Sequence, residues 1–199
     1  LEESVQRLDD IYEEYPELVS EKISLGQSFQ GRDIYAIKVS ANVDIDEDEA
    51  EVLYTGLHHA REPMGFMNLY YFIYWILENY GVDDRATQIL DTREMWFIPI
   101  VNPDGYEYNR SIAPNGGGMQ RKNMRETCNS SADGVDLNRN YGYAWDCQGT
   151  YEGDCDMSGS SGTGCNETYR GSSAFSEPET QIVRDFVYQH DFKIALNYH

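Results

Sequence analysis

The segment Met95–Val101 contains seven consecutive apolar residues and follows a stretch with helical periodicity. It lacks the alternation of apolar and polar residues that marks a half-exposed strand, and it is typical of a strand buried on both faces. Such a strand needs other elements packed above and below it. The segment therefore indicates the interior strand of an α/β protein with helices on both sides of its sheet.

Further strands and helices alternate along the chain. Within residues 1–19, apolar residues at helical spacing predict a helix that ends at Pro16. A longer helix is predicted from Pro63 to about Tyr80, ended by Gly81. The remaining patterns predict strands at Lys22–Leu25, Asp33–Val39, Glu51–Thr55 and Phe192–Tyr198, and helices at residues 84–92 and 176–189. We expect one domain over residues 1–199, a three-layer α/β/α fold with a mixed, largely parallel sheet.

Residues 102–175 show little periodicity and are predicted to be mostly loop, which in a compact domain is usually functional. The helix after this region is expected to begin with a capping box formed by Ser176 and Glu179. Polar residues follow the expected strands at Gly56–Glu62, Asn102–Tyr106 and His199. Ligand sites of α/β folds lie where strands end and loops begin, so these clusters mark the expected site.

Acidic residues greatly outnumber basic ones. Asp and Glu number 35 and Lys and Arg 15, giving a formal net charge of −20. This charge argues against nucleic acid as a partner, because phosphate binding needs a cationic surface, and against anionic lipid surfaces. The longest apolar stretch, Phe66–Leu77, is too short to span a bilayer. We therefore expect neither nucleic acid nor a membrane as a partner.

The four cysteines all lie in loop-like sequence and include no C-x-x-C pair, so a structural zinc site is disfavoured; they are Cys128, Cys147, Cys155 and Cys165. An even number of cysteines in such sequence indicates disulfides and an oxidising compartment. Sequons at Asn109, Asn129 and Asn166 are compatible with this interpretation. The chain is therefore expected to be extracellular or secreted.

His59 and Glu62 are three residues apart at the end of an expected strand, so both side chains can face one point. Imidazole nitrogen and carboxylate oxygen are good zinc ligands. The pair alone is a weak signal, since a glutamate at a helix start beside a surface histidine gives the same pattern. Among the four histidines, His199 at another strand end is the best placed third ligand, although a hydrogen-bonded core histidine would also fit there.

Taken together, these motifs resemble the zinc carboxypeptidases of the carboxypeptidase A type, also called metallocarboxypeptidases. The matches occur in the family's order over nearly the whole chain: Gly31–Ile34, His58–Pro63, Asn102–Tyr106, Arg121–Asn123, Gly134–Tyr141, Cys165–Gly171 and Ser176–Glu179. One departure is Gln120, where the family usually has tryptophan. Each motif has modest specificity, but their ordered combination is highly specific.

The resemblance implies one Zn²⁺ per chain, held by His59, Glu62 and His199 with a fourth position open for water. It also implies that a disulfide joins Cys128 to Cys165, which leaves Cys147 to pair with Cys155.

The family's substrate-binding roles carry over to four residues. Asn138 and Arg139 match the pair that holds the terminal carboxylate of a peptide, and arginine suits a planar anion. Arg121 matches the arginine that polarises the scissile carbonyl and stabilises the oxyanion. Arg61 matches a residue that contacts the substrate further from its end. Peptide or protein C-termini are therefore the implied substrates.

The implied function is hydrolysis of the C-terminal peptide bond by zinc-activated water. In the family the general-base glutamate and the last sheet strands follow the third ligand, so we expect the catalytic domain to continue beyond His199 and these 199 residues alone to be weakly active. Two alternatives remain: a related amidase acting on cell-wall peptides, and a catalytically dead module that binds C-termini. Asn138, Arg139 and Arg121 favour the peptidase.

Overall fold

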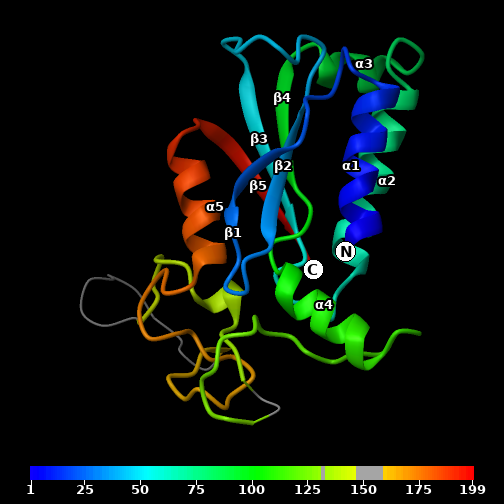
Figure 1. Cartoon of the computed structure of the whole chain (residues 1–199). Coiled ribbons are helices and arrows are strands. Elements are labelled where there is room, and N and C mark those ends of the chain that lie inside the picture. The colour runs from blue at the N-terminus through cyan, green and yellow to red at the C-terminus, as the bar shows by residue number, and fades with distance from the viewer. Residues whose placement is uncertain (131–132, 147–158) are drawn as a thin grey trace.

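The computed structural model describes residues 1–130, 133–146 and 159–199 (Figure 1). Within these ranges, five strands form one sheet in the order β1-β2-β4-β3-β5. The strands are β1 (Ile23–Gln27), β2 (Asp33–Val39), β3 (Ala50–Gly56), β4 (Arg93–Ile98) and β5 (Phe192–Tyr198). β2 pairs antiparallel with β1 and β4, whereas β3 pairs parallel with β4 and β5. The sheet is therefore mixed, and two of its four described pairings are parallel.

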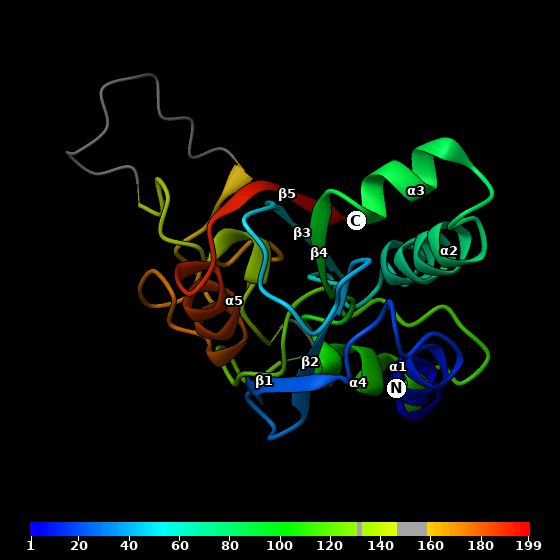
Figure 2. The ribbon, with the colours of Figure 1, turned by 90° about the horizontal axis from the view of Figure 1, so that it is seen from above.

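Helices cover both faces of the sheet. They are α1 (Glu2–Glu14), α2 (Met64–Glu78), α3 (Asp84–Leu90), α4 (Pro103–Ile112) and α5 (Pro178–Tyr188), with a 3₁₀ turn, η1 (Leu137–Arg139). α1, α2 and α3 lie on one side and α5 on the other, as both views of the ribbon show (Figures 1 and 2). The three-layer α/β/α arrangement is confirmed.

The core has two parts, one on each side of the sheet. Phe97 of β4 packs with the residues of α1 and α2, while its neighbour Ile98 packs with Val183 and Phe186 of α5. Phe97 and Ile98 point to opposite faces of the sheet, and both are fully buried. The prediction of a strand covered on both faces is therefore confirmed. The strand ends at Ile98 rather than Val101, since Pro99 has no N–H for the ladder.

α4 was not expected, because residues 102–175 were predicted to be mostly loop. Asn102 caps this helix by accepting a hydrogen bond from the Gly105 N–H, and Pro103 occupies its first turn. Gly105 weakens the helical pattern, but a Cβ there would lie 2.7 Å from the Ala60 Cβ. The glycine is required for close packing, and its low helix propensity weakened the helical pattern of the sequence.

The capping box expected at α5 is absent. The helix begins at Pro178 and its N-cap residue, Glu177, makes no capping bond with its side chain. Ser176 Oγ donates to Glu177 (2.7 Å), and the Glu179 carboxylate accepts from the Phe29 N–H (3.0 Å). Ser176 Oγ also accepts from Asn140 Nδ2 (2.9 Å). The two side chains that the local pattern assigned to the helix start are therefore bonded to other groups.

β5 has the bounds predicted for the last strand of the sequence. It lies at the edge of the described sheet, where Ile194 is 55% and Leu196 41% exposed. Its parallel register with β3 aligns Gly56 with Tyr198, so the residues that follow these two strands meet at one end of the sheet. This register brings His199 to the segment that contains His59.

The disulfide between Cys128 and Cys165 is confirmed, and it connects the segment before η1 to the segment before α5. The second expected pair, Cys147 with Cys155, lies outside the described residues. Among the described residues, no helix has the length and apolar character to cross a membrane.

Candidate metal and substrate site

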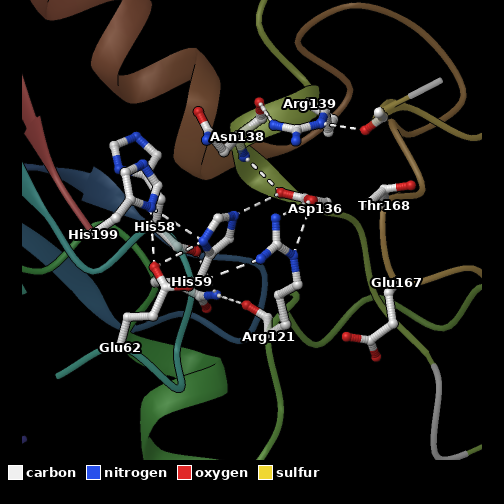
Figure 3. Close-up of polar contacts among 12 residues, drawn as sticks. His58, His59, Glu62, Arg121, Asp136, Asn138, Arg139, Glu167, Thr168 and His199 are labelled. Carbon is white, nitrogen blue, oxygen red and sulfur yellow. Dashed lines mark hydrogen bonds and ion pairs between the residues drawn. The ribbon is translucent and has the colours of Figure 1, made fainter. Parts of the chain in front are cut away.

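His59, Glu62 and His199 converge at the carboxyl ends of β3 and β5 (Figure 3). Glu62 Oε2 lies 2.9 Å from His59 Nδ1 and 3.0 Å from His199 Nδ1, and the two Nδ1 atoms are 3.1 Å apart. We call these three residues the metal triangle. Burial alone would raise the pKa of the Glu62 carboxyl, but its hydrogen bonds to the two histidines outweigh burial and lower it.

The triangle fits zinc. Tetrahedral zinc with bonds of about 2.0–2.1 Å to nitrogen and oxygen places its ligand atoms about 3.3 Å apart, close to the separations of these three atoms. The His59 side chain is only 4% exposed, whereas those of Glu62 and His199 are 30% and 34% exposed. One side of the triangle is therefore accessible to solvent, as a fourth position for water or substrate requires.

Asp136 contacts the metal triangle through the ring nitrogen of His59 that faces away from it, and no sequence pattern assigned this residue a role. This fully buried residue lies with Oδ1 3.1 Å from His59 Nε2. A carboxylate that accepts a hydrogen bond from the Nε2–H group leaves Nδ1 free to bind a metal, which is a common arrangement behind metal-binding histidines. The available signal was the position of Asp136 within the Gly134–Tyr141 motif, two residues before Asn138.

Arg121 lies beside the triangle and shares the same carboxylate. Its Nε and Nη2 donate to Asp136 Oδ2 at 3.1 and 2.9 Å, and its Nη1 is 3.8 Å from Glu62 Oε1. Burial raises the pKa of the Asp136 carboxyl, but bonding and charge from His59, followed by Arg121, outweigh burial and lower it. Asp136 therefore stays ionised and fixes the Arg121 guanidinium next to the candidate metal position.

Asn138 and Arg139 belong to η1, on the other side of Asp136. The Asn138 N–H donates to Asp136 Oδ1 (3.0 Å), so the carboxylate also caps this turn. The Arg139 guanidinium donates to the carbonyls of Gly159 (2.6 Å) and Asn138 (3.1 Å). Figure 3 shows both side chains above Asp136 and Glu62 below it.

Arg61 lies at a different part of the site. Its Nη1 donates to Glu167 Oε2 at 3.0 Å, and both side chains are accessible to solvent. The structure thus gathers the three candidate ligands with Arg121, connects Asn138 and Arg139 to them through Asp136, and places Arg61 against a loop carboxylate.

His58 contributes no atom to the triangle. Its Nε2 lies 2.7 Å from the Tyr141 hydroxyl, and burial, followed by the charges of His199 and His59, lowers the pKa of His58 to about 3. The imidazole is therefore neutral at physiological pH. It joins the end of β3 to the segment after η1, a contact that the sequence analysis did not anticipate.

Comparison with known proteins extends these observations. A family model described as zinc carboxypeptidase matches residues 4–199. A zinc carboxypeptidase of Saccharothrix mutabilis subsp. capreolus is 40% identical over 148 residues, which are 74% of this chain and 33% of that protein. Human carboxypeptidase A1 is 36% identical over 200 residues, covering 100% of this chain and 43% of that protein.

A solved structure of a carboxypeptidase has a similar fold. The crystal structure of carboxypeptidase A from Helicoverpa armigera superposes with a TM-score of 0.76 at 28% identity, covering 96% of this chain and 42% of that one. The chain thus spans less than half the length of each of these three proteins.

Proposed function

Because the chain belongs to the zinc carboxypeptidase family, we propose that it forms the metal and substrate site of a metallocarboxypeptidase, which hydrolyses the C-terminal peptide bond of peptides or proteins. The observation that carries the proposal is the convergence of His59, Glu62 and His199 with Arg121 next to them. A solvent-accessible triangle of ligands beside a fixed guanidinium is suited to hydrolysis of a polarised carbonyl.

Each polar group has a distinct task in this proposal. A zinc ion bound by the triangle would polarise the scissile carbonyl and lower the pKa of a bound water. Arg121 stabilises the negative charge that develops on the carbonyl oxygen, and it is already oriented by Asp136. Asn138 and Arg139 hold the terminal carboxylate of the substrate, which selects chain ends over internal peptide bonds.

In this proposal, the proton of the zinc-bound water is taken by a general-base glutamate, which the resemblance places beyond His199. No carboxylate of the triangle is assigned that task, because Glu62 is oriented toward both histidines. Two further parts are an extracellular location, which the disulfide supports, and a catalytic domain that includes all of residues 1–199. The Arg139 and Arg121 positions favour a peptidase over an amidase or a catalytically dead binding module.

The test uses the full-length protein, purified without chelator and analysed for metal and for turnover of N-blocked dipeptides. We expect one zinc per chain, turnover that chelation abolishes, and loss of both metal and turnover in His59→Ala. His190→Ala is the control, since His190 contacts Glu51 rather than the triangle. Zinc retention by His59→Ala would refute the ligand assignment, and binding of peptides without turnover would favour the dead module.

A further inference from the structure

Glu167 is a charged residue at the margin of the site to which the proposed function gives no task. Its side chain is 58% exposed and accepts a hydrogen bond from Arg61 Nη1 at 3.0 Å. Arg61 lies between the ligands His59 and Glu62 in the sequence, so its partner is held close to the metal triangle. In Figure 3, Glu167 lies beside Arg121, and Arg139 lies above both.

The loop that carries Glu167 is fixed to the residues around Arg121. Lys122, next to Arg121 in the chain, donates from Nζ to the carbonyls of Gly164 (3.0 Å) and Asn166 (2.9 Å). The disulfide to Cys165 and the bond from the Asp136 N–H to the Tyr169 carbonyl (2.8 Å) hold the same loop on both sides of Glu167. The carboxylate therefore has a defined position relative to the site.

The ion pair between Arg61 and Glu167 contributes little to the stability of the fold. Arg61 and Glu167 are both accessible to water, and such pairs contribute little to stability because solvent screens them. Either partner can consequently exchange its contact for one with a ligand at small cost. A substrate carbonyl can take the Arg61 donor while a substrate cation takes the Glu167 carboxylate.

The proposed function sets the direction of the substrate, and the present inference rests on it. With the terminal carboxylate at Arg139 and the scissile carbonyl at Arg121, the preceding residues continue toward Arg61 and Glu167. An extended peptide advances about 3.3 Å per residue, so the residue before the scissile pair, third from the C-terminus, is the first to pass Arg121.

We propose that Glu167 determines specificity at the third residue from the substrate's C-terminus, favouring a lysine or arginine and disfavouring an acidic side chain. A cation there pairs with the exposed carboxylate, whereas an anion is repelled by it and must compete with it for Arg61. Because the contact is made equally in ground and transition states, it changes KM rather than kcat.

The experiment compares two N-blocked peptides that differ only in lysine or glutamate at the third position from the C-terminus. With the full-length protein at low salt, we expect kcat/KM for the lysine peptide to be about two- to fivefold higher, through KM, since exposed charge pairs are of this strength. Glu167→Gln should bring the ratio near one, Glu167→Lys should invert it, and 1 M NaCl should suppress it in the wild type.

Glu17→Gln is the matched control, because Glu17 is exposed near the end of α1 and its substitution removes the same single negative charge. This variant should keep the wild-type ratio, which separates the local carboxylate from the field of a chain with charge −20. An unchanged ratio in Glu167→Gln, or an equal loss in Glu17→Gln, would overturn the inference. Absence of turnover with both peptides would instead contradict the proposed function, and calorimetric Kd values for the two peptides then decide the role of Glu167.

Discussion

Asp136 has two carboxylate oxygens, and each accepts two hydrogen bonds. Oδ1 accepts from His59 Nε2 and from the Asn138 N–H, while Oδ2 accepts from Nε and Nη2 of Arg121. One buried side chain thereby orients a candidate metal ligand, the candidate oxyanion donor and the turn that carries the candidate carboxylate clamp. A residue with this many partners in a dry environment is sensitive to loss of its charge.

Asp136→Asn tests this role at the level of the single residue. The amide keeps an acceptor for His59 but turns an N–H group toward Arg121, so one of the two contacts must be lost. We expect zinc affinity to fall about 10- to 100-fold, as for other groups that orient metal-binding histidines. The measurement is zinc Kd by competition with a chromophoric chelator.

Asp84→Asn serves as the control, since Asp84 is exposed in the first turn of α3. Its zinc Kd should equal that of the wild type. Equal Kd values for Asp136→Asn and the wild type would show that His59 is oriented by packing alone.

At the scale of elements, the start of α5 is anchored by buried carboxylates instead of a local cap. Glu177 accepts from Arg125 Nε (2.6 Å) and Asn123 Nδ2 (2.8 Å), and Glu179 accepts from Phe29 N–H, with both carboxylates fully buried. The helix is thus connected to the β1–β2 turn and to the segment after Arg121. Burial outweighs the hydrogen bonds to the Glu179 carboxyl, so the pKa of Glu179 is raised to about 7.

This elevated pKa predicts a pH dependence of stability. The folded state binds the Glu179 proton more tightly than the unfolded state, so the stability contribution is present below pH 4.5 and is lost as pH rises through about 7. At about 1.36 kcal/mol per pKa unit, the loss is about 3 kcal/mol. Relative to Glu179→Gln, the wild type should therefore lose stability between pH 4 and pH 8.

Urea unfolding of both proteins over this pH range gives the difference directly, because titrations common to the two chains cancel. Glu17→Gln again provides an exposed control, and its difference from the wild type should stay flat. Parallel curves for Glu179→Gln and the wild type would mean that the pKa of Glu179 is the same in the folded and unfolded states.

At the scale of the whole molecule, the described segments between α4 and α5 are held by side-chain contacts more than by regular structure. The disulfide joins residues 37 positions apart and closes the loop that contains η1. Lys122, only 1% exposed, and Asn123 bridge the same segments. A cross-link of this span acts mainly by reducing the conformational freedom of the unfolded chain.

Replacing Cys128 and Cys165 by alanine should therefore lower the free energy of unfolding by about 2–4 kcal/mol. The secondary structure should be retained, since the sheet and its two core clusters do not include either cysteine. Urea unfolding under non-reducing conditions measures the change. Equal stability of the variant and the wild type would show that the side-chain contacts alone hold the loop.

The sequence by itself determined the elements whose periodicity is strong. All five strands and the helices α1, α2, α3 and α5 were predicted within a few residues of their bounds, because burial on one or two faces leaves a pattern along the chain. The His59–Glu62 pair was also local, since a spacing of three residues places both on one turn. The family resemblance pointed to His199 and to the Cys128–Cys165 pair.

Only the tertiary structure decided what depends on contacts between distant segments. α4 was hidden because Gly105 is required by packing against Ala60, and the cap of α5 was replaced by bonds to Phe29 and Asn123. The parallel register of β3 and β5 brings His199 to His59, and the fold places Asp136, the N-cap residue of η1, against the other ring nitrogen of His59. Periodicity records which face of an element is buried, whereas the identity of the partner on that face is fixed only when the chain is folded.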